Sequence, residues 1–457
     1  MVLDGITIIA FFVIITVLFR YAAGSLGVRS LNLINTTYYI FAIQGYLGTS
    51  LAYLGLNSGH YIISVIPREA IELAMILVIA TGIALPLVVI FWNVVFGNFD
   101  MKKRWHSFVD QGISRNIDEK KLQLAVLLMM LVVVASTVYT FSVIGYVPML
   151  DVLFGGSSGA AADLRADASR GFAGNVYIRG FGMIALAPLT SFFCLAGLSL
   201  FGGRRWRALF LASIALAFIA LTYDLEKSPS AYFVFALFVL SQILGKKWSV
   251  GRTALIIGSL AGILVLAYLV VYGISSISLS FESGLLSRLT STSAGALMLH
   301  LTVFPEHVQF LDGSGLPGFS HLFGSDPDAA RSSRIVMYFF NSGGVEAGTA
   351  GVMNAMFVGE AYANWGMVGV IFAIVVVGTC IGVSHNCLIQ LDKSITAVLL
   401  YITLVRLNIL MLFGGFADYL YNSTMLVSVA TILLVSLFAN KKRVIDIRLS
   451  REPVLSS

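Results

Sequence analysis

The sequence has little charge for its length. Of its 457 residues only 11% are Asp, Glu, Lys or Arg, while 58% are hydrophobic and the mean hydropathy is +0.91. Soluble globular domains carry about 25% charged residues. The composition therefore excludes an ordinary soluble domain and predicts that the lipid bilayer surrounds most of the chain.

Cysteine and the common catalytic motifs are also scarce. The three cysteines, Cys194, Cys380 and Cys387, lie in or beside apolar runs, which favours buried thiols over a disulfide framework. The chain has no Walker loop, Gly-x-Ser-x-Gly elbow or His-Glu-x-x-His motif. Asp326-Pro327-Asp328 has the spacing of a metal-binding triplet, but the proline and the absence of an accompanying His or Glu make that hypothesis weak. We predict no metal and no other cofactor.

Long apolar runs are abundant. Because about 20 such residues cross the hydrocarbon layer as a helix, the runs predict an all-α polytopic membrane protein with about eleven transmembrane helices in one integral membrane domain, residues 1–457. The predicted spans are residues 5–20, 31–55, 71–97, 123–145, 180–201, 207–224, 231–245, 253–273, 364–390, 395–413 and 420–439.

The positions of the basic residues predict the topology. Basic clusters follow the third, fifth, seventh and last predicted spans: Lys102-Lys103-Arg104, Arg204-Arg205 with Arg207, Lys246-Lys247 with Arg252, and Lys441-Lys442-Arg443. The positive-inside rule places these connections in the cytoplasm, so we expect the N-terminus outside and the C-terminus inside. This distribution explains the net charge of +6 without a nucleic-acid partner.

Arginine is the main cation of the predicted outer side, where Lys227 is the one lysine. The outer arginines are Arg68, Arg165, Arg170, Arg179, Arg288, Arg331 and Arg334. A guanidinium binds two phosphate oxygens at once and stays charged, so this choice favours a phosphate or pyrophosphate ligand. The alternative is that these side chains form surface ion pairs with Asp163, Asp167, Asp326 and Asp328.

Two predicted outer loops are long. Residues 146–179 predict a glycine-rich loop with a short polar helix carrying Asp163, Arg165, Asp167 and Arg170. Residues 274–350 are too many for a simple connection, and long loops usually carry function. Within this second loop, Leu285 to Val308 predicts a helix lying in the membrane interface, and the region of His321, Arg331 and Arg334 predicts a lid or substrate clamp.

Few ionisable residues fall within predicted spans, and each is a candidate for function because charge is costly in lipid. Glu360 lies near the outer end of the helix that continues into the span 364–390, and Arg406 lies in the outer half of its span. The two could meet, either as a structural pair or as part of a site. Asp224 and Asp418 lie at outer span ends, and His385, near the cytoplasmic end, is expected to be structural. A proton-driven transporter would place part of its relay deeper in the membrane.

Residues Gly315–Gly369 resemble one bacterial family. The outer loop with Arg331 and Arg334, followed by GVMNAMFVGEAYANWGMVGVIFAIVVVG, is similar to the O-antigen and oligosaccharide repeat-unit polymerases of the Wzy type. The strongest likeness is Gly359-Glu360-x-Tyr362 followed by Asn364-x-Gly366-x-x-Gly369. Some members carry two arginine-glycine repeats of fixed spacing in their outer loops, and that spacing is not present here.

The resemblance implies an enzyme of the bacterial inner membrane with a periplasmic active site. It would join undecaprenyl-pyrophosphate-linked oligosaccharides into a surface polysaccharide, alongside chain-length regulator and flippase proteins. The donor is already activated, so the protein must supply orientation, charge stabilisation and a base. We expect Glu360, His321 and Arg406 in catalysis, with Glu306 and His307 as further candidate bases. The expected ligands of the pyrophosphate or glycan are Arg165, Arg170, Arg179, Arg288, Arg331, Arg334 and Tyr362.

Two other functions fit the sequence less well. An O-antigen ligase-like transferase would use the same donor with a different acceptor. A flippase or exporter is expected to show two similar halves, which this sequence lacks.

Overall fold

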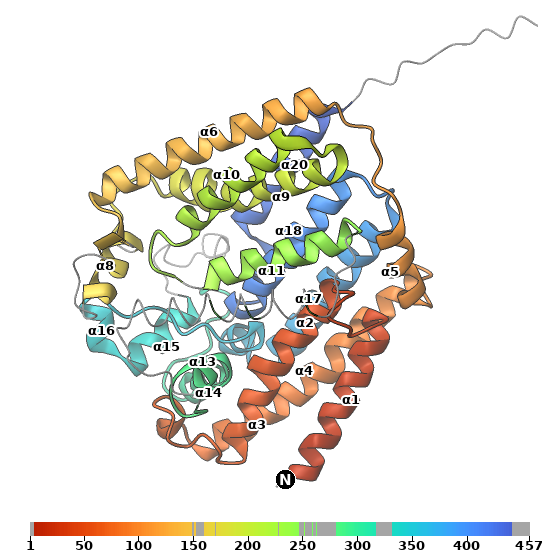
Figure 1. Ribbon diagram of the computed structural model, residues 1–457. Helices are drawn as coiled ribbons and strands as arrows, with labels where there is room; N and C mark the ends of the chain where they lie inside the picture. Colours follow the sequence, from red (N-terminus) through yellow and green to blue (C-terminus); the bar gives the residue numbers. More distant parts are fainter. Residues whose placement is uncertain are drawn as a thin grey trace, which may run out of the picture.

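A computed structural model describes residues 4–148, 150–151, 160–169, 171–226, 228–245, 251, 258, 262, 280–316 and 331–440. These residues form helices and no strand, apart from one isolated bridge between Ile117 and Asn440. Figure 1 shows the helices packed as one bundle.

Seven described helical segments are long and apolar enough to cross a membrane, so the chain is an α-helical multi-pass membrane protein. They are α1 (Gly5–Ala23), α4 (Arg68–Val95), α6 (Glu119–Ile144), η3 with α9 (Ile178–Ala185 and Leu186–Phe201), α17 (Phe357–Gln390), α18 (Ile395–Gly414) and α19 with α20 (Ala417–Leu420 and Ser423–Ala439).

Three further predicted spans are also helical, although they are shorter, more charged or interrupted. They correspond to α2, η1 and α3 in succession (Leu33–Ile40, Phe41–Leu47 and Gly48–Tyr53), to α10 (Gly203–Leu221) and to α11 (Ser228–Ile243). The predicted span at 253–273 lies outside the described residues. The count of eleven spans and the direction of insertion therefore stay predictions.

Capping residues explain where several of these helices begin and end. The side chain of Asp4 accepts a hydrogen bond from the Thr7 backbone N–H at the start of α1, and Ser394 does the same for Ala397 at the start of α18. The α6 helix ends at Gly145, whose φ of +84° is a left-handed conformation that glycine adopts without strain. Polar caps thus define the ends of segments whose interiors are almost wholly apolar.

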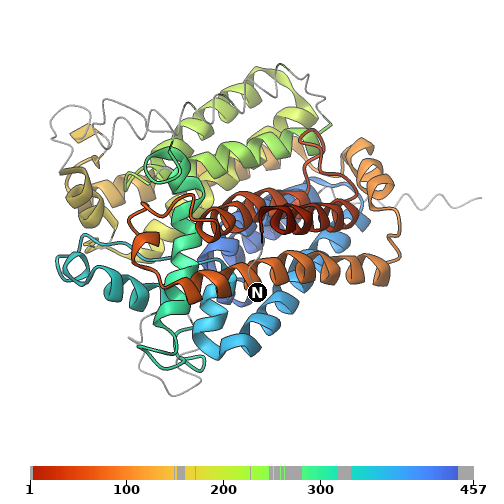
Figure 2. The ribbon, with the colours of Figure 1, turned by 90° about the horizontal axis from the view of Figure 1, so that it is seen from below.

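The helices form two groups that meet on α18. In Figures 1 and 2, α1 lies along α4, which packs against α17, while α6, α9, α10 and α20 form the opposite side of the bundle. The α18 helix contacts α2, α9, α11, α17 and α20, and 78% of its apolar window is buried, against 28% for α1. It is therefore the central helix of the described bundle.

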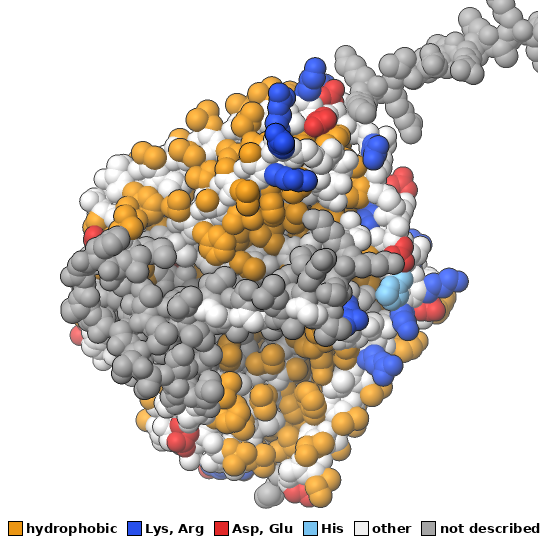
Figure 3. Space-filling model, in the orientation of Figure 1, with side chains coloured by type: hydrophobic (Ala, Val, Ile, Leu, Met, Phe, Trp, Pro, Cys, Tyr) orange, Lys and Arg blue, Asp and Glu red, His pale blue; other side chains and the backbone are white. Residues whose placement is uncertain are grey.

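Short helices cover one end of the bundle, here called the loop end. They are α8 (Ala160–Ser169), α13 (Leu285–Leu289), α14 (Ser291–Val303), α15 (Ser332–Phe340) and α16 (Ser342–Glu346). The opposite end carries α5 (Met101–Asp110), and in Figure 3 most visible Lys and Arg side chains lie towards that side of a largely hydrophobic surface. The distribution agrees with the charge bias read from the sequence.

The structure corrects the predicted interfacial helix at 285–308. That segment divides into α13 and α14, and every residue from Ala294 to Val303 in α14 is buried. The α14 helix packs against α3, α4 and α17, and the Cβ of an alanine at Gly48 would lie 2.3 Å from the Thr290 carbonyl oxygen. The large loop thus contributes a buried helix to the bundle and does not merely rest on the membrane surface.

The cysteines are free, as predicted, but only Cys194 is fully buried. Cys380 is half-buried and Cys387 is exposed, and both belong to α17. Exposure here means contact with the surroundings of the bundle, which for a membrane helix include lipid.

Candidate functional site

An arginine and two carboxylates meet at the loop end. Arg331 donates to Glu360 Oε1 from Nη2 at 2.9 Å and from Nε at 3.3 Å, and its Nη2 also lies 3.4 Å from Asp418 Oδ1. We call these three residues the Arg331 cluster. It joins the large loop to the first turn of α17 and to the α19 turn, three segments that are far apart in the sequence.

Two consecutive glycines make room for the carboxylates. A Cβ at Gly415 would lie 2.2 Å from Glu360 Oε2, and a Cβ at Gly414 would lie 2.1 Å from Asp418 Oδ2. Gly415 also has φ +153° and ψ +165°, a region essentially reserved for glycine. The turn after α18 lets the Ala417 backbone N–H donate to Glu360 Oε2 at 3.0 Å.

The three charged groups differ in how firmly they are held. The side chain of Glu360 is only 4% exposed and both its oxygens accept hydrogen bonds, whereas that of Asp418 is 20% exposed and its Oδ2 accepts none from the described residues. Burial acts against the charged form of Arg331, but Glu360 and Asp418 outweigh it and raise its pKa above the ordinary value. Glu360 therefore positions Arg331, and Asp418 is the carboxylate with an oxygen available to a ligand.

The cluster stands beside a break in α17. Trp365 and Gly366 have non-helical dihedrals, with φ +58° at Gly366, so a short first segment precedes the long span. Asn364 stabilises the break, since its Nδ2 donates to the Glu360 carbonyl and its Oδ1 accepts from Gly313 N–H. Phe310 lies over this region, where the edge of its ring meets Tyr362 with ring centres 5.7 Å apart. The motif that carries the family resemblance thus forms a kinked, buried entrance to a span.

The other predicted outer arginines are spread over the loop end. Arg334 donates to the Gly351 carbonyl at 3.3 Å, which holds the end of the large loop, and Arg165 pairs with Glu226 at 2.6 Å. The expected alternative of pairing is thus met for Arg165, though with a different carboxylate. Arg288 is exposed on α13, and Arg170 lies outside the described residues, as do His321, Asp326 and Asp328.

Arg179 has a structural arrangement. It donates to the carbonyls of Ala168 and Ser169 at the end of α8 and stacks on Phe172, with its Cζ 4.3 Å from the ring centre. Nearby, burial and then Glu226 raise the pKa of Asp224 to about 6. These contacts attach α8 to the bundle.

The remaining candidate bases, Glu306 and His307, lie elsewhere, as does His385, which was predicted to be structural. Glu306 is exposed, and the ring of His307 stacks on Phe339 with centroids 4.8 Å apart. His385 is fully buried and its Nδ1 is 2.8 Å from the Tyr401 hydroxyl, which agrees with its predicted structural role. None of these three side chains is hydrogen-bonded to the Arg331 cluster.

Glu360 and Arg406, which the sequence allowed to meet, form no ion pair in the structure. Glu360 binds Arg331 instead, because the kink of α17 and the α19 turn hold its carboxylate at the loop end. Arg406 is buried in the middle of α18, with 4% exposure. Its Nε has no hydrogen-bond partner, and it forms no ion pair with a described residue.

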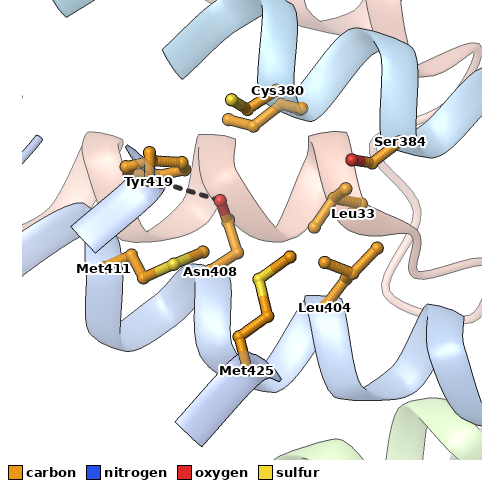
Figure 4. A pocket seen from close by; sticks show the side chains of 9 residues that line it. Leu33, Cys380, Ser384, Leu404, Asn408, Met411, Tyr419 and Met425 are labelled. Carbon is orange, nitrogen blue, oxygen red and sulfur yellow. Dashed lines mark hydrogen bonds between the residues drawn. The ribbon is translucent and has the colours of Figure 1, made fainter. Parts of the chain in front are cut away.

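A small cavity lies on the other side of α18. It measures about 80 Å³ and is lined mainly by apolar and sulfur-containing side chains, among them Leu404, Met411, Met425 and Cys380. Figure 4 shows its polar edge, where the Tyr419 hydroxyl donates to Asn408 Oδ1 at 2.8 Å. This volume is well below that of a site for a whole small molecule.

Sequence reasoning did not assign Asp418 to the site or explain Gly414-Gly415. A signal was present, because an acidic residue three positions after a glycine pair at a span end is costly unless it is paired. No protein-family model, curated protein or solved structure matches this chain. The function is therefore inferred from the geometry of the Arg331 cluster.

Proposed function

We propose that this protein polymerises undecaprenyl-pyrophosphate-linked oligosaccharide repeat units by metal-independent glycosyl transfer at the loop end. The observation that carries the proposal is the pairing of Arg331, from the large loop, with Glu360, in the segment that resembles the repeat-unit polymerases. The loop end would face the periplasm of a bacterial inner-membrane protein. Chain-length regulator and flippase proteins would be its pathway partners.

The location of charge favours transfer over transport. All four ion pairs among the described residues involve loop-end residues: Arg68–Glu72, Arg165–Glu226, Arg331–Glu360 and Arg331–Asp418. A proton-coupled transporter would need ionisable partners near the membrane midplane. A transferase that receives an already activated donor needs its polar groups only where the sugars lie.

Each member of the Arg331 cluster has a distinct proposed role. Glu360, bonded through both oxygens, fixes the guanidinium of Arg331, which is 35% exposed and can reach a ligand. Asp418 would accept the proton of the acceptor hydroxyl through its free Oδ2, while the pyrophosphate leaves from the donor sugar. Tyr362, 8% exposed beside Phe310, would contribute to the wall that contacts the glycan.

The test is polymerisation by purified protein with synthetic undecaprenyl-pyrophosphate repeat units and EDTA. Wild type should produce a ladder of products without any lipid A core acceptor. Arg331→Lys and Asp418→Asn should each lower the rate roughly a hundredfold, as expected for loss of one preorganised group. Arg68→Lys is the matched control, because it changes another paired loop-end arginine outside the cluster.

Three results would decide between the candidate functions. A ladder lost in the cluster variants and kept in Arg68→Lys supports the polymerase. Transfer that occurs only after a lipid A core acceptor is added would assign the chain to ligases. No transfer with several repeat units, together with movement of lipid-linked glycan across liposomes, would reject both enzymes in favour of a flippase.

A further inference from the structure

Arg406 is a buried cation without a counter-ion among the described residues. Its exposure is 4%, its Nε has no hydrogen-bond partner, and no described residue forms an ion pair with it. Ionisable groups within membrane helices almost always pair with another charge or with backbone carbonyls. Burying a guanidinium without an anion carries a large desolvation free energy, so a stable protein is expected to supply Arg406 with a negatively charged partner.

The helices that pack on α18 offer Arg406 no carboxylate that is without a partner among the described residues. Neither α18 nor three helices that pack on it, α9, α11 and α20, contain an Asp or Glu residue, and α2 has none either. Two other helices that pack on α18 each carry one acidic residue, Glu360 in α17 and Asp418 in α19, and both of these pair with Arg331. The missing negative charge must therefore come from outside the described protein.

A second polar group lies on the same face of α18. Thr403 precedes Arg406 by three residues and is 4% exposed. Its hydroxyl is buried and has no hydrogen-bond partner among the described residues. Residues three apart are neighbours on a helix. Asn408, about 200° further round, bonds instead to Thr37 and Tyr419 on the side of the cavity in Figure 4. Arg406 and Thr403 thus form a separate pair of unmet donors that faces away from that cavity.

We propose that Arg406 and Thr403 bind one phosphate group of a lipid headgroup drawn into the bundle. A guanidinium donates two parallel hydrogen bonds to a phosphate, and the threonine hydroxyl adds a third donor one helical turn away. A lipid is the expected source of this phosphate, because Arg406 lies eight residues from the end of a membrane-spanning helix. A water-soluble anion would have to lose its hydration to reach that depth. The phosphate could belong to a phospholipid or to a polyprenyl pyrophosphate, and only the second source rests on the proposed function.

The experiment measures the unfolding midpoint and lipid affinity of the purified full chain in nanodiscs. The probes are phosphatidylcholine alone, phosphatidylcholine with phosphatidylglycerol, and phosphatidylcholine with undecaprenyl pyrophosphate. Arg406→Met removes the charge at similar volume, Arg406→Lys keeps the charge without the fork, and Thr403→Val removes only the hydroxyl. Arg68→Met is the control for loss of a paired arginine.

We expect at least one of the two anionic lipids to raise the unfolding midpoint of the wild type. That lipid should bind Arg406→Lys at least about tenfold more weakly than it binds the wild type, because lysine cannot bind two phosphate oxygens in parallel. Arg406→Met should lose the lipid response while its lipid-free midpoint stays equal or rises, since an unpaired buried charge has been removed. Thr403→Val should weaken binding in the same direction, and Arg68→Met should retain it.

Two outcomes would overturn the inference. One is a wild-type protein that responds equally to all lipids, and the other is an Arg406→Lys variant with unchanged affinity for the anionic lipid. If Arg406→Met does not fold, Arg406→Lys and Thr403→Val still decide the matter. Response to phosphatidylglycerol with a failed polymerisation assay would keep the anion site while rejecting the enzyme, so the two proposals fail separately.

Discussion

Gly415 should be among the least replaceable residues of the chain, because two independent penalties coincide there. An alanine Cβ would lie 2.2 Å from Glu360 Oε2, so the carboxylate would have to move. The backbone, with φ +153° and ψ +165°, would be strained by about 1–3 kcal/mol in any residue with a Cβ.

Moving the carboxylate adds to this cost. Glu360 Oε2 would lose the Ala417 N–H at 3.0 Å, and a hydrogen bond to a charged group is worth about 1.5–3 kcal/mol. The pairing of Oε1 with Arg331 at 2.9 Å would be disturbed as well. Gly415→Ala should therefore lower the free energy of unfolding by roughly 3–6 kcal/mol in total.

Gly97→Ala is the matched control. Gly97 has φ +71° and open space where a Cβ would stand, so it pays only the backbone strain of about 1–2 kcal/mol. Denaturant unfolding in detergent micelles would compare the two variants, and the polymerisation assay would follow at a temperature where both are folded. Equal destabilisation by the two substitutions, or full activity of Gly415→Ala, would refute the close packing of Glu360 against this turn.

Three further predictions follow from contacts at the loop end. Burial raises the pKa of Asp224 to about 6, so the folded state binds this proton more tightly than the unfolded chain does. The stability that results is full below pH ~4 and should fall by about 3 kcal/mol as the pH rises through 6. Measured by unfolding at different pH values, Asp224→Asn should show a smaller fall in stability than the wild type. Asn364→Ala should lower the free energy of unfolding by about 2–4 kcal/mol, because the Glu360 carbonyl and the Gly313 N–H both lose the side chain of Asn364 as a partner. Denaturant unfolding measures this loss, and a value below half of it would show that other contacts stabilise the kink. Arg179→Lys should increase proteolysis and hydrogen exchange of α8 with little effect on global unfolding, since two carbonyl contacts and a ring contact attach that helix; unchanged exchange would contradict this role.

Much of the architecture was readable from hydropathy, which is a local property. A run of about 20 apolar residues has few options in lipid except a helix. Helices accordingly occur at each predicted span within the described residues, and the α8 helix was also foreseen. The burial of α14 was not predicted, because its composition also fits an interfacial helix. It is buried because it packs against α3, α4 and α17.

The candidate site was readable only in part. The sequence by itself singled out Glu360 and Arg406, because charge in or beside an apolar run is costly, and Arg331, because outer arginines favour a phosphate ligand. It could not determine which charges meet, since Glu360, Arg331 and Asp418 come from three distant segments. Only the tertiary structure decided that Glu360 binds Arg331 and that Arg406 has no ion-pair partner among the described residues. The physical reason is that hydrogen bonds form only over a few ångströms, and the kink at Gly366 and the turn at Gly415 hold the Glu360 carboxylate within that distance of Arg331.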